Sequence, residues 1–237
     1  MNITSKKSFL MNFMLITIAI VSSVLIYNYN YVDKDYTKID LNRAKKLMIV
    51  AHPDDETIWG GAHLLESDYL VVCITCGADK TRVKEFKKVM KETDDQYIML
   101  GYPDKVLGIR SSWKEDEIKI YNDLQQIISL KDWDLIVTHN VNGEYGHIHH
   151  KKTNKIVTQI YNDYNITEPL YFFGKYYTKG NLAKLENKPK EIDEELYKKK
   201  VDNLIEVYKS QSFIKESFNQ MFRYEDWIKY ENIIAKD

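Results

Sequence analysis

The chain has 237 residues, 44% of them hydrophobic, which is enough for one domain with a sizeable core. Its 34 Lys and Arg residues nearly balance its 35 Asp and Glu residues, so the formal net charge is only -1. Proteins that bind nucleic acids usually show a basic excess or a basic stripe. We therefore expect no nucleic acid among the partners of this protein.

The N-terminal segment is strongly apolar. Residues 9–27 carry no charged side chain, Lys6 and Lys7 precede them, and no convincing small-x-small cleavage site is found. A helix needs roughly 20 apolar residues to span a bilayer. We therefore predict a membrane-localised protein with a single-pass N-terminal anchor rather than a cleaved signal peptide.

Basic residues lie on both sides of this apolar run, so the sequence leaves open which side of the membrane the rest of the chain faces. The predicted divisions are a short basic tail at 1–8, the transmembrane anchor at 9–27, a linker at 28–44 and a folded domain at 45–237.

Beyond the linker, apolar strand-like runs alternate with amphipathic segments. We expect strands at 46–52, 69–76, 96–102, 133–140 and 169–177. We expect helices at 56–66, 81–93, 114–130 and within 149–164, and a helical tail after Pro189. Such alternation predicts an α/β fold with a Rossmann-like, doubly wound and mostly parallel sheet that has helices on both faces.

The two cysteines, Cys73 and Cys76, lie within the second expected strand. Residues three apart on a strand point to opposite faces, so these two thiols are not placed to form a disulfide. We expect free thiols buried in the core.

The six histidines fall into two windows, each at the end of an expected strand. The first window holds His52 and His63, and the second holds His139, His147, His149 and His150. In a doubly wound sheet of order 3-2-1-4-5, strands 1 and 4 are neighbours at the point where the chain reverses direction. Ligands bind there, outside the carboxyl ends of the strands. The two windows should therefore meet at one cleft.

Imidazole and carboxylate groups are common ligands of zinc and similar divalent ions. A catalytic zinc takes three protein ligands and keeps a fourth position for water. His52, Asp55 and one histidine from 147–150 would supply such a set, and Asp54 would remain free to take a proton from the water. A nearby histidine or tyrosine would stabilise an oxyanion. The pattern indicates a hydrolase of amides or esters.

Simpler interpretations exist for several of these residues. Asp54 or Asp55 would also be suited to cap the following helix. We expect His63 to serve packing or the surface and His149 to be exposed rather than catalytic. For His139, a role behind a metal ligand and a purely structural role are equally favoured.

The segment "AHPDDE" (51–56) followed by "GEYGHIHH" (143–150) resembles the PIG-L/LmbE family of zinc-dependent de-N-acetylases. The resemblance covers about 45–215. It includes "TRVKEF", which is similar to an Arg-x-x-Glu element of the family, and "YKSQ" (208–211), which is similar to a late Ser-Gln element. Many members read His-Pro-Asp-His where this chain has His147-Ile148-His149-His150.

The resemblance implies a role for each matching residue. The metal ligands would be His52, Asp55 and His150, and the general base would be Asp54. His147 would assist the tetrahedral intermediate, and Tyr145 would contact the oxyanion or the substrate. Arg82 would contact the substrate.

The resemblance also implies a function: removal of the acetyl group from an N-acetylglucosamine-containing glycoconjugate. The expected cofactor is Zn²⁺, with Fe²⁺ or another divalent ion as alternatives. With the predicted anchor, a lipid-linked or cell-envelope glycan becomes an expected partner. The alternatives are an amidase of another small conjugate and a non-catalytic sugar-binding module.

Overall fold

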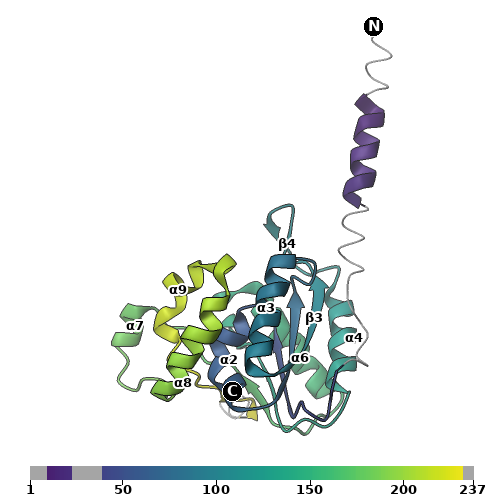
Figure 1. The fold of residues 1–237 in the computed structure, drawn as a ribbon. Coiled ribbons are helices and arrows are strands. Elements are labelled where there is room, and N and C mark those ends of the chain that lie inside the picture. Colours follow the sequence, from purple (N-terminus) through teal and green to yellow (C-terminus); the bar gives the residue numbers. More distant parts are fainter. Residues whose placement is uncertain (1–9, 23–38, 232–237) are drawn as a thin grey trace, which may run out of the picture.

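The structure, a computed structural model, describes residues 10–22 and 39–231 (Figure 1). Its main sheet has six strands in the order β3-β2-β1-β6-β7-β8. The strands are β1 (Lys46–Val50), β2 (Tyr69–Thr75), β3 (Gln96–Tyr102), β6 (Ile136–Thr138), β7 (Leu170–Phe172) and β8 (Ile228–Lys229). The first five strands in this order pair in parallel, and β8 pairs antiparallel with β7.

The five strands expected from the sequence are confirmed, and so is their order. The fourth expected strand is β6, and it lies beside β1 with Leu47 opposite Ile136. The chain therefore reverses direction between β1 and β6, and the loops that follow these two strands begin at the same edge of the sheet.

The central strand β1 is buried on both faces, as expected for a parallel strand covered by helices on both sides. Met48 and Val50 face one core cluster, and Leu47 and Ile49 face the other. The first cluster lies beneath α2, α3 and the C-terminal helices, and the second lies beneath α4 and α6. Figure 1 shows these two layers on either side of the sheet.

The main helices lie within about three residues of the expected ranges. They are α2 (Asp55–Glu66), α3 (Lys80–Thr93), α4 (Glu117–Ile128) and α6 (Ile148–Asp163). The shorter helices are α5 (Gly143–Gly146), α7 (Lys179–Ala183), α8 (Glu194–Lys199) and α9 (Phe213–Phe218). Single turns of 3-10 or π helix occupy Lys200–Leu204, Ile205–Val207, Lys209–Gln211 and Asn219–Met221. The expected helical tail is thus a series of short turns.

Three strands were not expected. One is β8. The other two, β4 (Lys105–Val106) and β5 (Ile109–Arg110), form a small hairpin. Its turn residues Leu107 and Gly108 have φ values of 51° and 79°, which suits a tight two-residue hairpin turn.

The predicted membrane anchor at 9–27, and with it the predicted membrane localisation, is wrong. Among the described residues, no helix is long and apolar enough to cross a membrane. In this region, the described residues 10–22 are helical. The predicted tail at 1–8, residues 9 and 23–27 and most of the predicted linker lie outside the described residues.

Both cysteines are free, as predicted. Cys73 is buried in the core, whereas Cys76 borders a cavity at the edge of the sheet. The expectation of two core thiols therefore holds for Cys73 alone.

Asp95 gives the fold a pH-dependent stability. One of its oxygens accepts the Tyr69 N–H at 2.7 Å, but the other oxygen is buried without a hydrogen-bond partner. Burial raises the pKa of Asp95 to about 7. The unfolded chain releases this proton near pH 4 and the folded chain near pH 7, so stability falls between these values.

We expect Asp95→Asn to remove this loss of stability at rising pH. The variant should match the wild type in unfolding free energy at about pH 4 and exceed it by about 2–4 kcal/mol at about pH 8. Urea denaturation at a series of pH values measures both curves. A constant difference between wild type and variant at all pH values would contradict the expected titration.

Candidate active site

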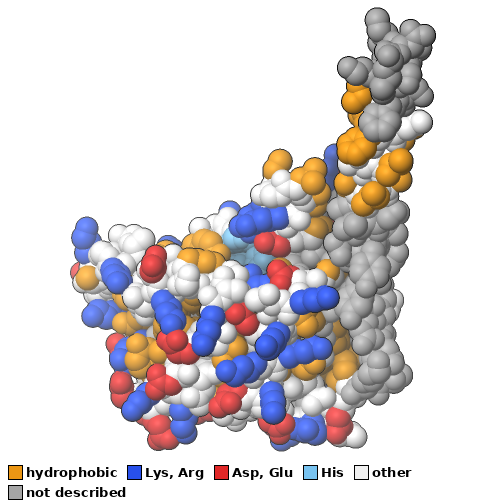
Figure 2. Space-filling view, turned by 45° about the horizontal axis from the view of Figure 1, so that its top comes forward, with side chains coloured by type: hydrophobic (Ala, Val, Ile, Leu, Met, Phe, Trp, Pro, Cys, Tyr) orange, Lys and Arg blue, Asp and Glu red, His pale blue; other side chains and the backbone are white. Residues whose placement is uncertain are grey.

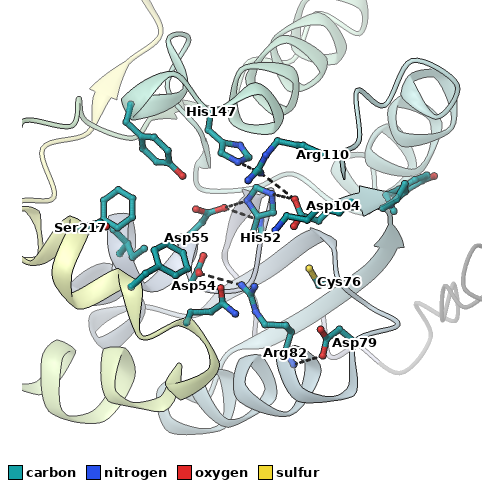
Figure 3. Close-up of a pocket in the computed structure, with 18 of the residues that line it drawn as sticks. His52, Asp54, Asp55, Cys76, Asp79, Arg82, Asp104, Arg110, His147 and Ser217 are labelled. Atoms are coloured by element: carbon teal, nitrogen blue, oxygen red, sulfur yellow. Dashed lines mark hydrogen bonds and ion pairs between the residues drawn. The ribbon is translucent and has the colours of Figure 1, made fainter. Parts of the chain in front are cut away.

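A cavity of about 1290 Å³ opens at the carboxyl ends of β1 and β6 (Figure 3). Figure 2 shows histidine side chains at the base of a hollow at this site. Six parts of the chain line the cavity. They are the β1–α2 segment, the β2–α3 segment, the segment from β3 to β5, the α5–α6 segment, Tyr176 after β7 and the C-terminal helical turns.

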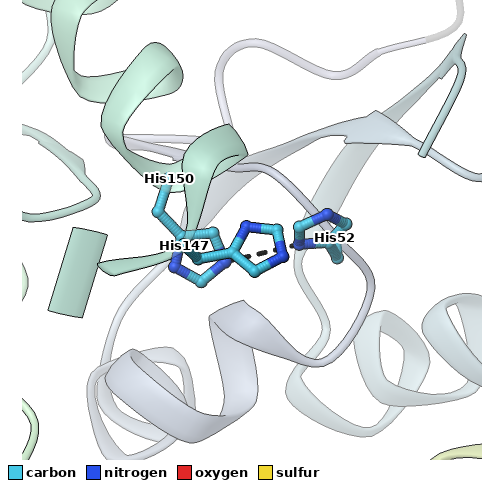
Figure 4. Close-up of side chains that lie close together, drawn as sticks. All are labelled: His52, His147 and His150. Atoms are coloured by element: carbon cyan, nitrogen blue, oxygen red, sulfur yellow. Dashed lines mark hydrogen bonds between the residues drawn. The ribbon is translucent and has the colours of Figure 1, made fainter. Parts of the chain in front are cut away.

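His52, Asp55 and His150 converge at this edge of the sheet. The His52 Nδ1 lies 3.1 Å from Asp55 Oδ2 and 3.4 Å from His150 Nε2, and His150 Nε2 lies 3.2 Å from Asp55 Oδ1. A tetrahedral zinc with bonds of about 2.0–2.1 Å keeps its ligand atoms about 3.3–3.4 Å apart. The three side chains therefore fit a divalent metal ion. Figure 4 shows His52 and His150 facing each other beside His147.

Each of these side chains is held in place by its neighbours. The backbone N–H of His52 donates to Asp55 at 2.8 Å. The Nδ1 of His150 contacts Glu144, which also accepts the backbone N–H of Asn140 at 2.6 Å. Because a carboxylate only accepts, His150 carries its proton on Nδ1 and presents the lone pair of Nε2 to the cluster.

The pKa of Asp55 reflects this setting. Burial raises it, but His150 and His139 outweigh burial and hold the pKa well below its usual value. Asp55 is therefore an anion in the midst of imidazole rings. An anionic carboxylate is the form that binds a metal ion.

Asp54 lies beside this cluster in an unusual backbone conformation. Its φ is 121°, a strained value for a residue with a side chain. Asp54 occupies the position before α2, yet its side chain makes no capping hydrogen bond, so capping does not account for it. Its carboxylate lies 3.2 Å from Arg82. Burial raises the pKa of Asp54 well above its usual value, and Arg82 opposes this shift.

His147 and Tyr145 lie on the other wall of the cavity. The His147 Nε2 accepts a hydrogen bond from Arg110, a residue of β5 that also pairs with Asp104 at 3.3 Å. Burial, followed by the neighbouring His150 and His52, lowers the pKa of His147 to about 2. In this arrangement His147 is therefore a neutral ring.

The two further elements of the family resemblance meet in space. The Ser210 backbone N–H donates to Glu85 at 2.8 Å, and the Ser210 hydroxyl lies 2.5 Å from the same carboxylate. Arg82 and Gln211, one from each element, line the cavity. These pairings connect α3 to the C-terminal turns and close that side of the cavity.

His149 was wrongly expected to be exposed, since it is fully buried. His139 is also fully buried, and it accepts the Ala51 N–H at 2.9 Å and contacts Glu144 at 3.2 Å, so it supports the cluster from behind. His63 lies away from the cluster and stacks on Trp227 with ring centres 3.7 Å apart, as its expected packing role suggests.

The sequence did not single out Glu144, Asp104 or Arg110 as site residues. Glu144 lies within the "GEYG" stretch quoted for the resemblance. A carboxylate so close to three histidines in the sequence could have marked it as a site residue. Asp104 and Arg110 lie in and beside the short hairpin, where no motif marks them.

Part of the chain matches a known protein family. The PIG-L family model, described as GlcNAc-PI de-N-acetylase, matches residues 47–161. An uncharacterized protein of Acanthamoeba polyphaga mimivirus is 34% identical over 158 residues. That match covers 59% of this chain and 65% of the viral protein, so it spans just under two thirds of the relative.

Two solved structures share the fold. The first is Dbv21, the deacetylase of the pseudoaglycone of the antimicrobial reagent A40926. It has a TM-score of 0.57 and 16% identity, and the match covers 73% of this chain and 85% of that one. The second is the N,N'-diacetylchitobiose deacetylase from Pyrococcus horikoshii, with a TM-score of 0.59 and 15% identity over 88% of this chain and 90% of that one. Residues 47–161 of this chain therefore form a PIG-L domain.

Proposed function

We propose that this protein is a metal-dependent hydrolase that removes the acetyl group from an N-acetylglucosamine-containing small glycoconjugate. The observation that carries the proposal is the convergence of His52, Asp55 and His150 beside Asp54, at the base of a large cavity in a PIG-L domain.

The proposed metal ligands are His52, Asp55 and His150, whose facing atoms have the spacing that zinc requires. Zn²⁺ is the first choice, and Fe²⁺ or another divalent ion is an alternative because nitrogen and oxygen ligands suit several such ions. The ion, when bound, lowers the pKa of a water molecule and polarises a carbonyl group.

Asp54 is the proposed general base. It borders the cavity next to Asp55 and is held by Arg82 at 3.2 Å. Its raised pKa suits a group that takes a proton from water and later releases it. The proposed role of Arg82 is to hold Asp54 and to contact the substrate from the same wall.

His147 and Tyr145 are proposed to face the acetyl carbonyl from the opposite wall. The Tyr145 hydroxyl is a donor for the developing oxyanion. His147 is proposed to assist the tetrahedral intermediate. Because its ring is neutral here, it would first take up a proton at Nε2 and then hand that proton to the departing amine. Since Arg110 now donates to His147 Nε2, this contact must break before His147 serves the substrate.

The cavity walls support a sugar substrate. Aromatic side chains border the opening, and sugar rings bind well against such faces. These side chains are Trp59, Tyr145, Tyr176, Phe213 and Phe218. The two solved structures of the same fold are named as a pseudoaglycone deacetylase and an N,N'-diacetylchitobiose deacetylase.

Substrate profiling tests the proposal. The protein is incubated with N-acetylglucosamine glycosides, N,N'-diacetylchitobiose and a set of non-sugar N-acetyl amides, and the released acetate is measured. We expect acetate release from the sugar substrates. Preferential release from the non-sugar amides would indicate an amidase of other conjugates, and sugar binding without acetate release would indicate a non-catalytic module.

Metal removal is the second test. We expect chelation followed by gel filtration to lower acetate release by at least about 100-fold. The reaction needs the bound ion, because the ion lowers the pKa of the water molecule. Adding one equivalent of Zn²⁺ should restore it. Full activity in protein shown to be metal-free by elemental analysis would contradict the proposed site.

A further inference from the structure

A second set of contacts lies behind His52, on the side away from Asp55. The His52 Nε2 lies 3.0 Å from His149 Nδ1, and the His149 Nε2 lies 2.7 Å from the carbonyl oxygen of Ser111. The ring of His149 stacks on Trp113 with centres 4.1 Å apart and planes 1° from parallel. Trp113 in turn donates its indole N–H to the carbonyl of Pro103 at 2.8 Å.

These contacts fix the proton positions on His149. A backbone carbonyl can only accept a hydrogen bond, so His149 Nε2 must carry a proton at 2.7 Å from Ser111. The neutral ring has one N–H, and its other nitrogen is a lone pair. His149 Nδ1 is therefore an acceptor, and it faces His52.

The proton position on His52 follows from that of His149. The acceptor Nδ1 of His149 at 3.0 Å requires a donor, so His52 carries its proton on Nε2. The lone pair of His52 is then on Nδ1, the atom that faces Asp55 and His150. Acceptors of all three side chains would then converge, as they do around a bound cation and not in a hydrogen bond between His52 and Asp55. A metal-binding histidine usually donates its other N–H to a carboxylate, carbonyl or water. Here the acceptor is an imidazole.

We propose that His149 is a positioning residue that sets the tautomer of His52, so that His52 presents Nδ1 to the metal. The proposal rests on the metal site put forward under Proposed function. The segment that follows the hairpin contributes to this positioning. The carbonyl of Ser111 orients His149, and Trp113 stacks on the His149 ring.

Asp104 is a competing partner of the same two rings. Its Oδ1 lies 3.4 Å from His52 Nε2 and 3.5 Å from His149 Nδ1. It is the more distant acceptor for His52, and it is already paired with Arg110. His52, Asp104 and His149 together also have the spacing of a ligand set. A second ion there would require His52 to lose both ring protons and bridge two metals, and the test below distinguishes this case.

The test uses full-length protein and zinc alone. His149→Phe keeps a ring on Trp113 but removes the acceptor, and His149→Asn keeps an acceptor near the position of Nδ1. The matched control is His63→Phe, since His63 also stacks on a tryptophan but lies away from the ligands. Zinc dissociation constants come from competition with a chelating dye. Two-dimensional ¹⁵N NMR of zinc-loaded wild type detects scalar coupling across the His52 Nε2–H to His149 Nδ1 hydrogen bond.

We expect His149→Phe to raise the zinc dissociation constant by about 10–100-fold, the usual effect of losing a partner behind a metal ligand. His149→Asn and His63→Phe should stay within about 3-fold of the wild type. The wild type should show coupling between His52 Nε2 and His149 Nδ1.

Unchanged zinc affinity in His149→Phe, or absence of the coupling in zinc-loaded wild type, would overturn the inference. Two zinc ions in the wild type and one in His149→Phe would also overturn it, by making His149 a ligand. If His149→Phe does not fold, the inference is tested by the coupling in the wild type and by the zinc affinity of His149→Asn. A wild type that binds no zinc refutes the proposed metal site itself, whereas failure in zinc-binding protein refutes only the role of His149.

Discussion

Replacing Asp54 by Asn is expected to lower kcat for acetate release by about 10²–10⁴-fold, the range that a general base contributes. The amide has the shape of the carboxylate and still accepts a hydrogen bond from Arg82, but it cannot take a proton from water. Asp54 pairs with Arg82 at 3.2 Å rather than with the ligand cluster. Zinc affinity should therefore stay within about 3-fold of the wild type, since its ligands are untouched.

Asp79→Asn is the matched control for this variant. Asp79 also borders the cavity, but its carboxylate caps α3 by accepting the N–H groups of Thr81 and Arg82. Asn is as good a cap as Asp, so fold and activity should change little. Acetate release is measured at saturating substrate, and bound zinc is quantified in each preparation.

Two results would count against the base assignment. One is full activity in Asp54→Asn. The other is loss of bound zinc in parallel with activity, because Asp54 would then serve the ligand set rather than the proton transfer.

The meeting of the two histidine windows was predictable from the sequence. Parallel strands align their carboxyl ends, and the neighbouring positions of β1 and β6 follow from right-handed crossovers in a doubly wound sheet. His52 and His150, 98 residues apart in the sequence, therefore face each other at 3.4 Å. The alternation of strand and helix was sufficient for this step.

The surroundings of the ligands were not predictable in the same way. His149 and His150 are adjacent on one helix, and both are buried because different elements cover them. Glu144 of α5 covers His150, and Trp113, which follows the hairpin, covers His149. A single sequence gives the spacing of residues along α6, but it does not give the position of an irregular hairpin.

The predicted membrane anchor shows another limit of the sequence pattern. Hydropathy measures the apolar character of a run, whereas spanning a bilayer also requires a continuous helix of about 20 residues. The run at 9–27 is apolar, yet no helix among the described residues is long and apolar enough to cross a membrane. The C-terminal turns differ from this apolar run. Their sequence is polar, yet it contributes a buried ion pair to the core.

This ion pair ties the C-terminal segment to α2. Lys200 is fully buried, and its Nζ donates to Glu225 at 2.7 Å and to the carbonyl of Ile58 at 2.8 Å. Glu225 also accepts the N–H groups of Ala62 and His63 at 2.8 and 3.2 Å. Burial raises the pKa of Glu225, but Lys200 and His63 outweigh it and lower the pKa to about 2. Its contribution to stability is therefore present above about pH 4 and is lost as the pH falls towards 2.

Glu225→Ala is expected to lower the unfolding free energy by about 3–5 kcal/mol, because it leaves a buried ammonium without its counter-charge. It also leaves the Ala62 and His63 N–H groups without their acceptor. Lys200→Met should cost less, about 1–3 kcal/mol, since Glu225 then keeps its other hydrogen-bond donors. Urea denaturation of both variants at about pH 7 measures the difference. An equal or larger cost for Lys200→Met would show that packing of the lysine stem against Gly61, rather than the charge of Glu225, dominates this contact.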